Sequence, residues 1–152
     1  MINHHVKVVQ IDKAITAIGK SFTGDYAASP KYASEVQNML TEAGITFVPN
    51  KVMGVYYNNP ESTATEKLKC FQGFFPENEN YTPNPALYRV TLKGKYLYTK
   101  VSGDTAAIIF EGYSALFRYI QENGIALKSN IGYQVSTFEN NLITIEIYME
   151  II

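Results

Sequence analysis

The amino-acid sequence predicts an α+β fold: a tandem β-α-β-β repeat forming a single antiparallel sheet of about eight strands, with two helices on one face. Three observations lead to this fold class. Two stretches share one amphipathic helical spacing, several stretches alternate apolar and polar residues as strands do, and short matches recur about 80 residues apart. A duplicated fold has a pseudo-two-fold axis, and we expect a ligand cleft at that axis.

The first half begins with two predicted strands, residues 5–11 and 15–22, separated by a turn at residues 12–13. The helix that follows starts at Ser29, a typical N-cap residue, and ends before Gly44, a typical C′ residue. Its apolar stripe has the spacing i, i+4, i+7, i+8 and i+11: Tyr32, Val36, Met39, Leu40 and Ala43. This stripe is expected to pack on the sheet.

The middle of the chain holds the most strand-like stretch, residues 52–57, where β-branched and aromatic residues precede Asn-Asn-Pro. Residues 67–75 are predicted to form a strand that pairs back on it. Residues 77–85, rich in Asn, Glu and Pro, are predicted to be a surface loop.

The second half starts with two predicted strands, residues 87–92 and 95–101, joined across Lys93-Gly94. A helix is predicted from about residue 105 to 123, with the stripe Ile109, Tyr113, Leu116, Phe117 and Ile120. The chain then closes with a predicted hairpin, residues 133–138 and 142–151, around a turn near Asn140-Asn141.

Short matches relate the two halves, which span about residues 5–75 and 86–152. Thr23-Gly24-Asp25 corresponds to Ser102-Gly103-Asp104, Glu42-Ala43-Gly44-Ile45 to Glu122-Asn123-Gly124-Ile125, Gly54 to Gly132, and Asn58-Asn59 to Asn140-Asn141. The offsets are 79, 80, 78 and 82 residues, so the register holds with small slips. The matches therefore indicate an internal duplication.

Composition narrows the class of protein. The 152 residues, 46% hydrophobic and 18% charged with a formal charge of −1, predict one domain, residues 1–152, without the basic excess that nucleic-acid binding needs. No apolar run approaches the roughly 20 residues that span a bilayer, and no signal peptide is evident. The single cysteine fits a reducing compartment, so we expect a cytoplasmic protein.

A specific resemblance is carried by Gly-Val-Tyr-Tyr-Asn-Asn-Pro at residues 54–60 and Glu-Lys-Leu-Lys-Cys at residues 66–70. Together they resemble the central signature of the GyrI-like small-molecule-binding domains. These are effector-binding domains of AraC-type and MerR-type drug regulators, and they also occur as free-standing proteins. The resemblance extends over the 103–124 helical unit and residues 144–148, and it implies a tandem repeat with a ligand cleft between the halves. With no helix-turn-helix segment beside the domain, the free-standing form is expected.

The resemblance also indicates where a ligand would bind. Ligand-binding members carry a pattern like Phe-Glu-Val-Tyr on the penultimate strand, with the glutamate at the base of the pocket. Here the corresponding residues are Tyr133-Gln134-Val135-Ser136, so Gln134 replaces that glutamate. The family's preference for cationic ligands is therefore not expected to transfer.

Glu146, two residues before Tyr148, is a possible substitute for the missing carboxylate. With a three-residue hairpin loop, Gln134 would lie opposite Glu146 and share its face; with a two-residue loop, Gln134 would lie opposite Ile147 instead. The alternative is that Glu146 is an ordinary solvated strand residue.

Aromatic residues complete the predicted site, since the chain has twelve Tyr and eight Phe. The candidate ligand-binding aromatics are Tyr56, Tyr96, Tyr98, Phe110, Tyr113 and Tyr148. Tyr96 and Tyr98 share one face of a strand, where stacked tyrosines would hold a flat ligand or a cation. Tyr113 and Phe117 lie on the helical stripe, for which a place in the core is the simpler interpretation.

Other chemistry is not expected. Cys70 has no nearby activating His, His4-His5 alone is a weak metal site, and the sequence has no phosphate-binding loop or nucleophile elbow. No catalytic residue, metal or cofactor is predicted. The leading hypothesis is a non-enzymatic protein that senses or sequesters a hydrophobic aromatic compound. Its rivals are an interaction protein acting on DNA gyrase and a hydrolase of small reactive rings that would use Glu146 with Tyr148.

Overall fold

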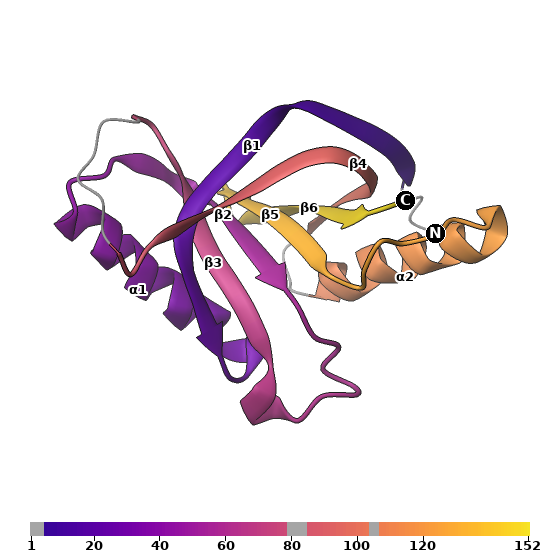
Figure 1. Ribbon diagram of the computed structural model, residues 1–152, viewed down its shortest axis with the longest axis horizontal. Helices are drawn as coiled ribbons and strands as arrows, with labels where there is room; N and C mark the ends of the chain where they lie inside the picture. The colour runs from indigo at the N-terminus through magenta and orange to yellow at the C-terminus, as the bar shows by residue number, and fades with distance from the viewer. Residues whose placement is uncertain (1–4, 79–84, 104–106) are drawn as a thin grey trace.

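The structure is a computed structural model that describes residues 5–78, 85–103 and 107–152 (Figure 1). Its helices and strands, in chain order, are β1 (Lys7–Thr23), α1 (Ser29–Glu42), β2 (Phe47–Tyr56), β3 (Lys69–Pro76), β4 (Tyr88–Gly103), α2 (Ala107–Asn123), β5 (Gly132–Glu139) and β6 (Leu142–Glu150). Two short 3₁₀ helices, η1 (Tyr26–Ala28) and η2 (Thr65–Lys67), precede α1 and β3. The predicted loop at residues 77–85 and the predicted start of the second helix fall partly outside the described residues.

The sheet is antiparallel throughout and closes into a barrel with the strand order β1-β3-β2-β5-β6-β4. Closure comes from β1, which pairs with β3 on one side and with β4 on the other. Both helices lie outside the barrel, α1 beside β1 and β3 and α2 beside β4 and β6 (Figure 1). An α+β fold with one antiparallel sheet and two helices was predicted correctly; closure was not predicted.

The expected count of about eight strands is wrong, because two predicted strand pairs are each one long strand. Residues 5–11 and 15–22 belong to β1, and residues 87–92 and 95–101 belong to β4. The two supposed turns face each other: Ile11 pairs with Gly94, and the register then shifts before Ile15 pairs with Leu92. Such irregularities bend strands, so β1 and β4 curve together and close the barrel instead of ending.

Alternation along the strands gives the barrel an outer and an inner face. Ile18 and Phe74 pack outward against Val36 and Leu40 of α1, as predicted for the stripe of that helix. On the other side of the barrel, Ile145, Ile147 and Met149 pack outward against Leu116 and other residues of α2. Residues of opposite parity form the inner cluster: Ala17, Met53, Val55, Phe71, Leu92, Tyr96, Val135 and Tyr148. Phe117 is 44% exposed, so its predicted place in the core is wrong.

The hairpin between β5 and β6 decides which residues share a face. Glu139 pairs with Leu142, leaving the two-residue loop Asn140-Asn141, and both loop residues have positive φ (50° and 63°). Two-residue hairpin loops of type I′ require this conformation, and asparagine tolerates it well. Gln134 therefore lies opposite Ile147, and Glu146 lies on the other face of the sheet.

Candidate functional site

Two buried glutamines flank a glycine on the outer face of β3, β2 and β5. Gly54 of β2 pairs with Gln72 of β3 on one side and with Gln134 of β5 on the other. The two glutamines are only 3% and 6% exposed. Because neighbouring strands lie about 4.8 Å apart, the backbones of the two glutamines are separated by roughly 10 Å, and Gly54 itself contributes no side chain between them.

The ring of Tyr56 covers that glycine. Tyr56 lies in the next row of the outer face, between Cys70 and Gly132, and its side chain folds back toward Gly54. A Cβ atom on Gly54 would lie 2.8 Å from both Cε2 and Oη of Tyr56. Gln72 Nε2 donates a hydrogen bond of 3.3 Å to Tyr56 Oη. A glycine is therefore required at residue 54 for the ring to take this position.

Tyr113 of α2 covers the second glycine in a similar way. A Cβ atom on Gly132 would collide with the Tyr113 hydroxyl group, which accepts a 2.8 Å hydrogen bond from Gln134 Nε2. Burial raises the pKa of Tyr113 to about 12; the bond from Gln134 lowers it, and the nearby Tyr56 and Tyr26 raise it further. Tyr113 is therefore a neutral phenol at physiological pH.

Tyr26 of η1 ties this region to the 54–70 signature. Its ring contacts the ring of Tyr56 edge-on, with centroids 4.9 Å apart. Its hydroxyl group donates to the carbonyl oxygens of Lys69 (2.9 Å) and Asn58 (3.1 Å) and accepts from the Asn58 N–H (3.1 Å). Tyr56 Oη also donates to Ser29 Oγ at the start of α1 (3.4 Å). The signature thus fixes the end of β2, the start of β3 and the two tyrosines relative to one another.

We call this group the tyrosine–glutamine cluster: Tyr26, Ser29, Tyr56, Cys70, Gln72, Tyr113 and Gln134, above Gly54 and Gly132. The cluster contains no acidic or basic residue, and burial raises the pKa of the Cys70 thiol and of the Tyr26 phenol. The cluster offers aromatic faces, phenol oxygens and amide groups. It can stack on a ring and exchange hydrogen bonds with it, but it supplies no charged side chain to pair with an ion.

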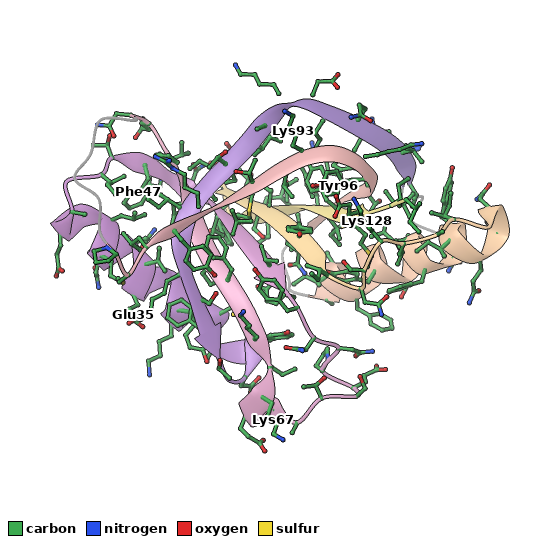
Figure 2. The ribbon with its side chains drawn as sticks, viewed as in Figure 1. Glu35, Phe47, Lys67, Lys93, Tyr96 and Lys128 are labelled. Carbon is green, nitrogen blue, oxygen red and sulfur yellow. The ribbon has the colours of Figure 1, made fainter. Side chains whose placement is uncertain are left out.

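A second polar group lies on the inner face of β4 and β6. Tyr98 Oη donates to Glu146 Oε2 at 2.8 Å, and Tyr148 Oη donates to the same oxygen at 3.4 Å. The rings of Tyr98 and Tyr148 are 5.0 Å apart, and Tyr96 lies 6.0 Å from Tyr148, among the strands of the barrel (Figure 2). Burial, followed by the adjacent Glu146 carboxylate, raises the pKa of both Tyr98 and Tyr148.

The predicted site residues therefore fall into two groups on opposite faces of the sheet. Tyr56, Tyr113 and Gln134 meet on the outer face. Tyr96, Tyr98, Glu146 and Tyr148 meet on the inner face. Glu146 therefore does not take the place of the missing glutamate beside Gln134. Phe110, the remaining candidate, is 76% exposed on α2, three residues before Tyr113.

Several members of the cluster were missed from the sequence. Gly54 and Gly132 were predicted to be matching positions of an internal repeat, yet the tyrosine rings that cover them were not inferred. Gln72 and Tyr26 carry no sequence signal for a site, since only the β2–β3 pairing and the η1 turn bring them to Tyr56. Among residues 5–78, 85–103 and 107–152, no group of three or more His, Cys, Asp or Glu side chains could hold a metal ion. In the same part of the chain, no helix combines the length and apolarity needed to cross a membrane.

Solved structures with the same fold support the architecture. The C-terminal domain of EcmrR superposes with a TM-score of 0.70 at 12% identity, covering 99% of this chain and 97% of that one. EcmrR in its complex with DNA superposes with a TM-score of 0.67 at 12% identity, and the match covers 98% of this chain and 57% of that chain. A Listeria innocua protein described as a hydrolase gives 0.63 at 5% identity, covering 97% of this chain and 91% of that one. At these identities the likeness establishes the fold alone.

Sequence comparison gives a more specific assignment. No curated protein matches the chain. The family model of the GyrI-like small molecule binding domain matches residues 4–151, nearly the entire sequence. The match includes both glycines of the tyrosine–glutamine cluster and all of its side chains. The chain belongs to the GyrI-like small-molecule-binding domain family.

Proposed function

We propose that this protein binds a small, flat, uncharged aromatic compound at the tyrosine–glutamine cluster, without catalysis, and acts as a sensor or as a sequestering protein. The observation that carries the proposal is the row Gln72–Gly54–Gln134, in which two buried amides flank a position without a side chain. Family membership supports a ligand-binding role in general. The cluster supports its location and its neutral character.

The location is also supported by the symmetry of the strand pairing. Gly54 pairs with Gln134, and Tyr56 pairs with Gly132. The repeat offset of 78 residues relates Gly54 to Gly132 and Tyr56 to Gln134, so it exchanges these two pairs. The relation supports a pseudo-two-fold axis through the facing residues Val55 and Tyr133. A ligand at the cluster would then lie at the junction of the two halves, where pockets are common.

Two rival functions receive less support. A ring-opening hydrolase would need a carboxylate and a tyrosine beside the ligand, and Glu146 and Tyr148 lie on the inner face, away from Gln134. An interaction with DNA gyrase would need an exposed docking surface, whereas the two glutamines of the cluster are buried and suit a small molecule better.

The test compares two ligands with the same ring system, the neutral naphthalene-2-carboxamide and the cationic 2-naphthylmethylamine. Fluorescence titration should show saturable binding of the amide, with the amine bound at least tenfold more weakly because no carboxylate compensates its lost hydration. Gln134→Leu should lower the affinity for naphthalene-2-carboxamide by about threefold to tenfold, because one hydrogen bond to the ligand is lost. The control Tyr98→Phe, on the inner face, should leave both affinities unchanged. Preferential binding of the amine, or no binding of either compound, would overturn the proposal.

A further inference from the structure

A ring already occupies the floor of the proposed site, and that ring belongs to the protein. The phenol of Tyr56 lies over Gly54, within 2.8 Å of where a Cβ atom would be. Its backbone belongs to the neighbouring row, between Cys70 and Gly132, so the side chain leans out of its own row to take this place. The space between the two glutamines is therefore complementary in shape to a phenol ring.

The hydrogen bonds at this ring are weak for such a buried position. Gln72 is 3% exposed, yet within the part of the chain that the structure describes its amide nitrogen has only long contacts, 3.3 Å to Tyr56 Oη and 3.8 Å to Cys70 Sγ. N–H···O bonds are normally 2.7–3.2 Å, and sulfur is a weak acceptor. Tyr56 Oη in turn donates to Ser29 Oγ over 3.4 Å. A buried amide donor thus points into the site without a strong acceptor.

Gln134 contrasts with Gln72 on the other side of Gly54. Its amide nitrogen donates to Tyr113 Oη at 2.8 Å, an ordinary hydrogen bond. Both tyrosines are half-buried, but Tyr113 packs against the hydrophobic cluster beneath α2, whereas Tyr56 lies at the end of β2. Of the two covering tyrosines, Tyr56 is the one whose displacement breaks only long hydrogen bonds.

We propose that the ligand class is a neutral phenol, and that it binds by replacing the Tyr56 side chain over Gly54 and accepting a hydrogen bond from Gln72. This inference rests on the proposed function and specifies its ligand. A free phenol can approach Gln72 at normal distance, because it is not tethered to the Tyr56 backbone one row away. Tyr56 then closes the site when no ligand is bound.

The test uses 4-methylphenol, which reproduces the tyrosine side chain, and toluene, which lacks the hydroxyl group. In Tyr56→Ala the space over Gly54 is vacant, so 4-methylphenol should bind at least tenfold more tightly than to the wild type. Calorimetry should also show that this variant binds 4-methylphenol about fivefold to tenfold more tightly than toluene, because toluene cannot accept the hydrogen bond from Gln72. Adding Gln72→Met, which has similar volume but no amide, should remove the preference for the phenol.

Two further variants keep the result interpretable. Leu116→Ala opens an apolar space beneath α2 and should favour toluene over 4-methylphenol, as a control for non-specific cavity filling. If Tyr56→Ala does not fold, Tyr56→Phe retains the ring but loses the bond to Gln72. It should then bind 4-methylphenol about threefold more tightly than the wild type.

Three results would overturn the inference: weaker phenol binding after truncation of Tyr56, equal binding of toluene and 4-methylphenol, or a preference that survives Gln72→Met. Binding of naphthalene-2-carboxamide distinguishes failure of this inference from failure of the proposed function. If that amide binds the wild type and responds to Gln134→Leu while the phenol shows no preference, the site is correct and the ligand class is wrong. If neither the amide nor the phenol binds, both proposals fail.

Discussion

Gln134→Glu should convert the neutral cluster into a pH-sensitive one. The side chain at residue 134 is 6% exposed, and burial raises the pKa of the Tyr113 and Tyr26 phenols and of the Cys70 thiol in the same cluster. A carboxylate placed there loses its hydration and gains only hydroxyl donors, so burial should raise its pKa. The same change should create binding of 2-naphthylmethylamine, because the buried carboxylate then has an ion partner in the ligand.

The expected loss of stability follows from that pKa. A glutamate titrates near 4.3 in the unfolded chain, and a moderate effect of burial would place it at about 6 in the folded protein. Each pKa unit corresponds to 1.36 kcal/mol, so the variant should lose about 2 kcal/mol above the folded pKa. Because the folded pKa is the higher one, the loss should be absent below about pH 4 and grow until about pH 6.

Urea denaturation at about pH 4, 6 and 8 measures this directly, with the wild type subtracted at each pH. Gln10→Glu is the matched control, since Gln10 is exposed on β1 and the same chemical change there should give no pH-dependent loss. A free energy difference for Gln134→Glu that is equal at all three pH values would refute the reasoning. It would mean that water reaches residue 134 freely in the folded protein.

Three further changes test other parts of the structure. Glu146→Gln should lower the pKa of Tyr98, because the adjacent carboxylate contributes to raising it. Ultraviolet titration of the phenolate should then show its transition at lower pH, and an unchanged transition would contradict the hydrogen bond between Tyr98 and Glu146. Gly132→Ala should lower the free energy of unfolding in urea by about 1–3 kcal/mol, since the new methyl group would collide with the Tyr113 hydroxyl group. An unchanged free energy of unfolding would show that α2 can shift away from β5 without cost. Leu40→Ala should cost about 2–5 kcal/mol, because Leu40 is fully buried on the side of α1 that packs on the sheet. A loss below about 1 kcal/mol would contradict that packing.

The helices and the order of elements were predictable because their signals are local. Val36 and Leu40 recur at helical spacing and are buried as expected, while Gly44 and Gly124 follow the helices with positive φ (73° and 62°). The pairing of residues 67–75 back on the central strand was also predicted correctly, with Tyr56 facing Cys70. Such features depend on neighbours in sequence or on a single short connection.

Barrel closure was not predictable in the same way. The turn-like residues near Asp12 and at Gly94 resemble strand ends, because glycine and charged residues usually interrupt strands. Only the pairing of β1 with β4, across about 80 residues of sequence, shows that the two interruptions face each other and form a bend. Phe117 was misassigned because the buried face of α2 follows Ile108, Gly112 and Leu116, and the residue after Leu116 turns toward solvent.

The character of the candidate site depends on hairpin geometry more than on composition. Glu146 and Gln134 are close in the sheet, but the two-residue loop Asn140-Asn141 places them on opposite faces. One more loop residue would turn the entire polar row of β6 outward, since side chains alternate with a period of two. With the observed register, Glu146 accepts hydrogen bonds from Tyr98 and Tyr148 on the inner face of the barrel, and the proposed ligand site over Gly54 lies on the outer face. At the proposed site the family's carboxylate position is residue 134, and the glutamine found there is uncharged.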